Sequence, residues 1–214
     1  MSIAHHPGDE LLLGYAAGAV SEGVALLVAT HLALCPLCRA VVAGAEAAGG
    51  SLLAEVAPVA LERDAYRSLL ARLDGPPSAE VARSALIAGE VPAPLQAYVG
   101  GDFGRLNWRH ITSGLAYFPL PTRGKTRARL IRVAPGAAVA THSHRGEEWT
   151  LVLTGSYSDV TGNYRAGDVQ STTPEIRHMP VADAGPVCIN LAVTDAPLVF
   201  EGFLPKLVGK FFGF

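Results

Sequence analysis

Residues 136–155 read GAAVATHSHRGEEWTLVLTG and combine a strand-like pattern with three possible metal ligands. Side chains on a β-strand point alternately to opposite faces. His142, His144 and Glu148 have the same parity, so we expect all three to line one interior face. The adjacent acid Glu147 has the opposite parity and is expected on the outer face. The stretch therefore predicts a metal site inside a β-structure.

A fourth ligand for this site follows the turn at Gly167, where the segment GDVQSTTPEIRH ends at His178. Three imidazoles and one carboxylate can hold Zn²⁺, Mn²⁺, Fe²⁺, Ni²⁺ or Cu²⁺ and leave coordination positions open. We predict a divalent metal here, with zinc as the first choice. The alternative is a set of packed histidines that bind no metal.

The chain around this site alternates with a period of two, which predicts a small β-barrel or jelly roll. The strand-like segments are RARLIRV (127–133), WTLVLTGSYSDV (149–160) and VCINLAV (187–193), separated by Gly and Pro turns. Cys188 is expected to be a small buried residue in the last of them. The basic run TRGKTRARLIR (122–132) predicts a turn and an edge strand with solvated charges.

Closer to the N-terminus the apolar residues have helical spacing instead. Helices are expected at 9–20, 22–34, 36–48 and 59–73, with a short one at 78–88. Pro36 favours the first position of a helix, so a break falls at Cys35, and Gly49 and Gly50 are expected to end the third helix.

The fold class that follows is α+β with two domains. We predict an all-α zinc-binding bundle at 1–88, a Pro- and Gly-rich linker arm at 89–106, and a jelly-roll barrel at 107–214. The C-terminal segment EGFLPKLVGKFFGF (201–214) is expected to pack onto one of these domains, the alternative being an amphipathic peptide on a membrane.

The stretch THLALCPLCR (30–39) carries a second group of ligands where two helices meet. His31, Cys35 and Cys38 need a fourth partner for a tetrahedral Zn²⁺ site, and the N-terminal pair His5 and His6 offers two candidates, of which we prefer His6. Two other interpretations are open: a redox CxxC pair, or buried cysteines beside an unrelated histidine. The redox pair is less favoured because such a motif should follow a strand in a βαβ pattern, whereas this one follows a helix.

The net charge is only −2, but it is unevenly distributed. Residues 1–90 carry ten acidic and five basic side chains, against nine and twelve in residues 91–214. Phosphate affinity depends on Lys and Arg, so the acidic half argues against direct nucleic-acid binding. It suits a basic protein partner, and the alternative is a merely solvated acidic face. The chain shows neither a signal peptide nor an uncharged apolar run of membrane-spanning length, and its three cysteines do not suggest a disulfide scaffold. We expect a cytoplasmic protein.

Two family resemblances rest on these motifs. The HP pair near the N-terminus, DELLLGYAAG and VATHLALCPLC resemble the zinc-binding anti-sigma domain over roughly residues 1–85, which implies zinc ligands at His6, His31, Cys35 and Cys38. Gly136, the HxH pair, Glu148 and Gly155 match the spacing of the first cupin motif. The segment around His178 resembles the second cupin motif more loosely, since that motif's glycine is missing and Ala182 replaces its asparagine.

The whole chain is similar to the ChrR-type anti-sigma factors. This resemblance implies a non-enzymatic regulator that sequesters a sigma factor of the extracytoplasmic-function class and releases it under oxidative stress such as singlet oxygen, so that transcription is negatively regulated. The alternative is a metal-dependent cupin enzyme of the dioxygenase kind with an accessory zinc-stabilised helical domain. A DNA-binding repressor is disfavoured by the acidic N-terminal half.

Overall fold

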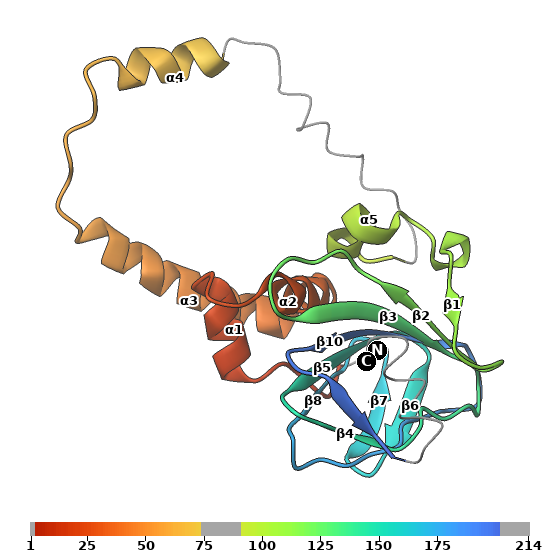
Figure 1. Ribbon diagram of the computed structural model, residues 1–214. Helices are drawn as coiled ribbons and strands as arrows, with labels where there is room; N and C mark the ends of the chain where they lie inside the picture. Colours follow the sequence, from red (N-terminus) through yellow and green to blue (C-terminus); the bar gives the residue numbers. More distant parts are fainter. Residues whose placement is uncertain (1–2, 74–90, 202–214) are drawn as a thin grey trace.

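The computed structural model describes residues 3–73 and 91–201 of the chain (Figure 1). The helix expected at 78–88 and nearly all of the C-terminal segment 201–214 lie outside the described residues. The rest consists of a helical part followed by a β-barrel, which confirms the predicted fold class.

The helical part contains α1 (Asp9–Ala16), α2 (Glu22–Leu34), α3 (Pro36–Ala54) and α4 (Ala65–Leu73). α1 is shorter than predicted because Gly18 adopts a left-handed backbone, φ +66°, that ends it. Cys35 is extended and Pro36 opens α3, as the sequence indicated.

Two further predicted boundaries in this part are wrong. α3 runs through Gly49 and Gly50, whose φ angles stay negative, and ends at Ala54. A glycine costs about 1 kcal/mol in a helix interior relative to alanine but does not remove a hydrogen bond, so it weakens the helix without stopping it. α4 begins at Ala65 instead of residue 59, because the Asp64 carbonyl accepts the first helical hydrogen bond, from Ser68, and aspartate is favoured at that position.

The barrel consists of short antiparallel strands in three sheets (Figure 1). The large sheet has the order β1-β2-β3-β10-β5-β8, and two smaller sheets have the orders β7-β6-β9 and β11-β4. The strands are β1 (Arg109–His110), β2 (Leu115–Pro119), β3 (Arg127–Val133), β4 (His142–His144), β5 (Glu148–Thr154), β6 (Ser156–Asp159), β7 (Gly162–Arg165), β8 (Val169–Thr172), β9 (Val181–Ala182), β10 (Cys188–Thr194) and β11 (Leu198–Phe200).

The predicted strands appear with two corrections. β3 is not an edge strand, because it pairs with β2 on one side and β10 on the other, and its Arg129 is buried. The segment predicted as one strand at 149–160 is divided at Gly155, whose φ is +68° and whose Cβ, if present, would meet the Cys188 backbone at 2.9 Å. Cys188 is fully buried, as expected.

One apolar core joins the helices to the barrel. α2 packs on the outer face of β3, β5 and β10, where Leu27 and Val28 share a cluster with Leu130, Leu151 and Leu191. The segment expected as a linker arm also contributes, since it forms α5 (Ala93–Val99) and the short helix η2 (Phe103–Arg105), with Leu95 and Phe103 buried.

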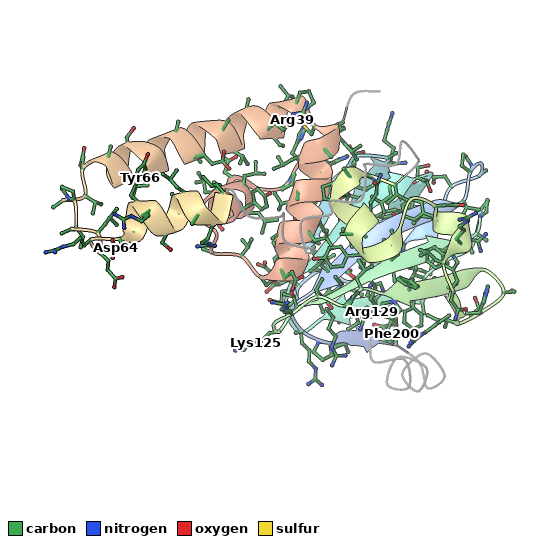
Figure 2. All side chains as sticks on the ribbon, turned by 90° about the horizontal axis from the view of Figure 1, so that it is seen from above. Arg39, Asp64, Tyr66, Lys125, Arg129 and Phe200 are labelled. Atoms are coloured by element: carbon green, nitrogen blue, oxygen red, sulfur yellow. The ribbon has the colours of Figure 1, made fainter. Side chains whose placement is uncertain are left out.

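The rest of α3 and the whole of α4 extend away from this core (Figures 1 and 2). The buried residues of α3 are Cys38 and Val42, and none of residues 43–73 is buried. We call residues 43–73 the arm. By length and composition alone α3 could also cross a membrane, but a single such helix is weak evidence for a span, and its first turn is tied to the rest of the protein.

Two candidate metal centres

His6, His31, Cys35 and Cys38 converge beside the junction of α2 and α3, and one donor atom from each lies within 4.8 Å of the others. We call this group the helical centre. The extended Cys35 between the two helices brings His31 at the end of α2 and Cys38 in the first turn of α3 to the same point. His6 joins them from the N-terminal segment, whereas His5 turns to the barrel, where its ring packs on Tyr164.

The donor distances of the helical centre fit a tetrahedral zinc ion. His31 Nε2 lies 3.3 Å from Cys38 Sγ, and His6 Nδ1 lies 3.4 Å from both sulfurs. With ordinary Zn–N and Zn–S bond lengths, neighbouring donors of a tetrahedron are about 3.3–3.8 Å apart. His31 Nδ1 donates to the Gly167 carbonyl at 2.9 Å, so in the neutral ring Nε2 is the nitrogen that carries the free lone pair.

Burial favours the uncharged forms of two residues of this centre, His31 and Cys38, through their pKa values. Burial lowers the pKa of His31, against the opposing effect of its hydrogen bond with Gly167. Burial, together with the hydrogen bond and charge of Cys35, raises the pKa of the Cys38 thiol to about 12. A metal that binds here must therefore displace a proton from Cys38, which couples metal affinity to pH.

His142, His144, Glu148 and His178 form a second buried group inside the barrel, again with one donor atom from each within 4.8 Å of the others. We call it the barrel centre. His142 and His144 occupy alternate positions of β4, Glu148 opens β5, and His178 pairs with His142 through their backbones. Glu147 is exposed, as its parity predicted.

The imidazoles of the barrel centre point lone pairs at one another. His142 Nδ1 donates to the Ala140 carbonyl at 2.9 Å, and His178 Nδ1 donates to the Asp159 carboxylate at 2.7 Å. In the neutral rings the two Nε2 atoms, 3.0 Å apart, are then both acceptors. Such an arrangement is repulsive unless a cation or a proton lies between them.

Glu148 completes the donor set with an ionised carboxylate. Its Oε2 is 3.0 Å from His144 Nε2 and 3.8 Å from His142 Nε2. Burial would raise the pKa of Glu148, but the hydrogen bonds and charges of His142 and His144 in their protonated forms hold it well below its usual range. Neighbouring donors of a six-coordinate ion with bonds near 2.1 Å are about 3.0 Å apart, so the residues fit a divalent metal.

Sequence reasoning missed the residues that hold these ligands in place. Asp159, at the end of β6, accepts from His178, from Gln170 Nε2 at 2.8 Å and from Thr161. Burial would raise the pKa of Asp159, but these hydrogen bonds keep it well below the ordinary value. A carboxylate behind a ligating histidine fixes its tautomer and orientation. No local signal marks Asp159, because it meets His178 only through the pairing of the small sheets.

A cavity of about 360 Å³ opens from the barrel centre. His142, Glu148 and His178 form part of its wall, and Arg129 lies in the same lining. Most of the remaining wall is apolar and comes from the segment after β1, from β2 and β3, and from the segments around β4 and β11: Ile111, Leu115, Ile131, Val139, Leu198 and Phe200. Arg129 and Phe200 both belong to the barrel part (Figure 2). The cavity can admit a small molecule to the metal ligands.

The arm carries an exposed apolar surface at the opposite end of the molecule (Figure 2). Leu52 and Leu53 near the end of α3 are 68% and 73% exposed, and Leu69 and Leu73 of α4 are 51% and 71% exposed. Further exposed apolar residues lie between the two helices, among them Val59 and Leu61. So many exposed apolar side chains within one segment mark a candidate site for a macromolecular partner.

Three of the matches to known proteins identify the family. The family model described as the ChrR cupin-like domain matches residues 96–195. The anti-sigma-E factor ChrR of Cereibacter sphaeroides is 46% identical over 215 residues, which cover 99% of each chain. A crystal structure of Rhodobacter sphaeroides SigE in complex with the anti-sigma ChrR matches with a TM-score of 0.81 and 44% identity, over 91% of this chain and 100% of that one.

Proposed function

Because the chain belongs to the family of the anti-sigma factor ChrR, we propose that it binds a sigma factor of the extracytoplasmic-function class and keeps that factor from RNA polymerase. The observation that carries the proposal is the match along nearly the whole chain to an anti-sigma factor, together with the match to a ChrR that is solved in complex with SigE. Transcription from the promoters that this sigma factor reads is then negatively regulated.

The arm is the part of the protein proposed to contact the sigma factor. Its apolar side chains are interspersed with exposed charges of both signs, among them Glu62, Asp64, Arg63 and Arg67. Apolar side chains bordered by charged ones are a usual composition of a protein interface, and charges of both signs help to select the partner. Burial of this surface against the sigma factor also accounts for an apolar α3 without a membrane.

The helical centre is proposed to hold Zn²⁺ through His6, His31, Cys35 and Cys38. A bound zinc ion would supply a crosslink between the N-terminal segment and the α2–α3 junction, and so fix the direction in which α3 leaves the core. In this proposal the site has a structural role, and Cys35 and Cys38 act as zinc ligands and not as a redox pair.

The barrel centre is proposed to hold a divalent metal, with zinc as the first choice, through His142, His144, Glu148 and His178. We place the response to oxidative stress such as singlet oxygen in this domain, because its imidazoles face a cavity that small molecules can enter. Oxidation or ligand exchange there lowers the affinity for the sigma factor only if the barrel before the change and the barrel after it stabilise the complex to different degrees. The family relationship favours this regulatory role over a dioxygenase-like enzyme, and a cytoplasmic location follows from the proposed partner.

The test of the proposed function uses the purified full chain and the extracytoplasmic-function sigma factors of its genome. One of them is expected to form a stable complex with the chain on size exclusion, and added chain is expected to suppress transcription by core polymerase with that sigma factor. If no such sigma factor binds while the chain turns over a small molecule, the enzyme is the correct assignment.

The response is tested on the same complex by illuminating it with a photosensitiser. Light is expected to release the sigma factor, and a dark sample is the control. The His142→Ala, His144→Ala double variant is expected to bind the sigma factor and to retain it under illumination. Equal release from wild type and variant would contradict the assignment of the response to the barrel centre.

A further inference from the structure

The helical centre is in contact with the barrel through two consecutive residues of one turn. This turn connects β7 to β8 and spans residues 165–168. Gly167 presents its carbonyl to Nδ1 of His31 at 2.9 Å, and His31 is fully buried. Because a carbonyl can only accept, this contact fixes the tautomer and the ring plane of His31.

Asp168, the next residue, holds the segment that delivers His6. Its Oδ1 accepts from the backbone N–H groups of Ala4 at 2.7 Å and His5 at 3.0 Å. Val169 N–H in turn donates to the His5 carbonyl at 3.1 Å, so residues 3–6 run along the start of β8. We call residues 3–6 the strap. Asp168 is fully buried and its Oδ2 accepts from Arg165 N–H at 3.0 Å, so the carboxylate is itself fixed.

The turn and the strap are also closely packed. Gly167 has φ +96°, and a Cβ on it would lie 2.7 Å from a side-chain carbon of Ile3. A larger residue at this position would have to push the strap away from the turn. Two of the four donors of the helical centre, on His6 and His31, are therefore oriented by atoms of the barrel.

We propose that the 165–168 turn of the barrel is the outer support of the helical centre, with Asp168 as a positioning residue that presents His6 and Gly167 as the acceptor that orients His31. The proposal rests on the metal assignment made above for the helical centre. It predicts that the affinity of the helical centre for its metal depends on the carboxylate of Asp168, which is neither a ligand nor part of the helical domain. Partners of this kind change metal affinity by about 10- to 100-fold when they are removed.

The test compares the full-length wild type with Asp168→Ala and Asp168→Asn. Co²⁺ is the probe, because cobalt bound to thiolates absorbs in the near ultraviolet and the donors of the barrel centre include no cysteine. Titration against a competing chelator gives the affinity of the helical centre from this band. Total metal analysis follows the barrel centre in the same samples.

Asp168→Ala is expected to weaken Co²⁺ binding at the helical centre by about 10- to 100-fold. The Co²⁺ affinity of Asp168→Asn should lie between those of wild type and Asp168→Ala. Its amide oxygen still accepts from Ala4 and His5, but its NH₂ group cannot accept from Arg165. The visible bands of tetrahedral Co²⁺ should broaden in Asp168→Ala as the position of His6 loosens. Metal at the barrel centre should be unchanged.

Asp183→Ala is the matched control. Asp183 accepts from the hydroxyls of Ser156 and Ser158 in another part of the barrel, so its loss removes a carboxylate with two hydrogen bonds and leaves the turn intact. An unchanged cobalt affinity in both Asp168 variants, or an equal loss in Asp183→Ala, would overturn the proposal. Absence of the thiolate band in wild type would instead contradict the metal assignment itself.

Discussion

Nε2 of His142 and Nε2 of His178 face each other at 3.0 Å, while the other nitrogen of each ring donates to a fixed acceptor. Two acceptors at this distance need a positive charge between them. At the helical centre His31 has the same arrangement: its Nδ1 donates to the Gly167 carbonyl, and its Nε2 faces the other donors.

Removal of the barrel ligands His142 and His144 by alanine is expected to cost about one equivalent of metal per chain. The helical centre should keep its own metal, because its donors come from other elements. Elemental analysis of the purified variant beside wild type checks this. A full metal content in the variant would show that the barrel centre holds none.

The converse variant, Cys35→Ser with Cys38→Ser, is expected to lose the other equivalent. Loss of this ion should also lower the free energy of unfolding, because the proposed ion would link the N-terminal segment to the α2–α3 junction. Metal analysis and thermal unfolding measure the two effects. A variant with unchanged metal content would favour cysteines that are merely buried.

Replacement of Asp159 by Asn tests the support of His178. The asparagine cannot offer a charged acceptor to Nδ1, so metal affinity at the barrel centre is expected to fall by about 10- to 100-fold while the ligands stay in place. Chelator competition gives the affinity. Asp183→Asn is the control, and an equal fall in that variant would point to general weakening of the barrel.

Aspartates at Leu52 and Leu53 are expected to weaken sigma-factor binding strongly and to leave protein stability nearly unchanged, because both side chains are already in water. Val160→Asp is the matched control, since Val160 is 78% exposed on the barrel. Binding is measured by calorimetry and stability by thermal unfolding. If the control loses as much affinity as the double variant, the arm is not the contact surface.

Metal binding at the helical centre is expected to strengthen as the pH rises. The Cys38 thiol, with a pKa raised to about 12, keeps its proton in the metal-free protein at neutral pH and must release it to bind a cation. Each displaced proton makes the affinity about tenfold higher per pH unit below that pKa. Titrations between pH 6 and 8 should therefore give a slope of at least about one, and a flat profile would contradict thiolate ligation.

The sequence predicted the two kinds of structure and the groups of residues that would meet, because period and parity are local properties. Pro36 after Cys35 was enough to place the α2–α3 junction, and the alternation from His142 to Glu148 was enough to place three side chains on one face. The α+β fold with a cupin barrel is confirmed. That these groups hold metals, and where the domains divide, stays a prediction.

What the sequence did not reveal depends on contacts between distant segments. Glycines at 49 and 50 looked like a helix end, but a glycine only weakens a helix whose hydrogen bonds continue. The charges around Arg129 suggested an edge strand, but β10, from much later in the chain, pairs with the free side of β3. Asp159 and Asp168 look like ordinary turn residues until the fold brings His178 and the strap to them.

The burial of α2 against the barrel bears on how the protein can be divided. A cut after residue 73 would expose Leu27 and Val28 to water and would leave His31 Nδ1 and the amides of Ala4 and His5 without the acceptors they have here. The helical part and the barrel are therefore not structurally independent. A helical fragment made for binding studies would differ from the full chain at the helical centre and would be unaltered only at the arm.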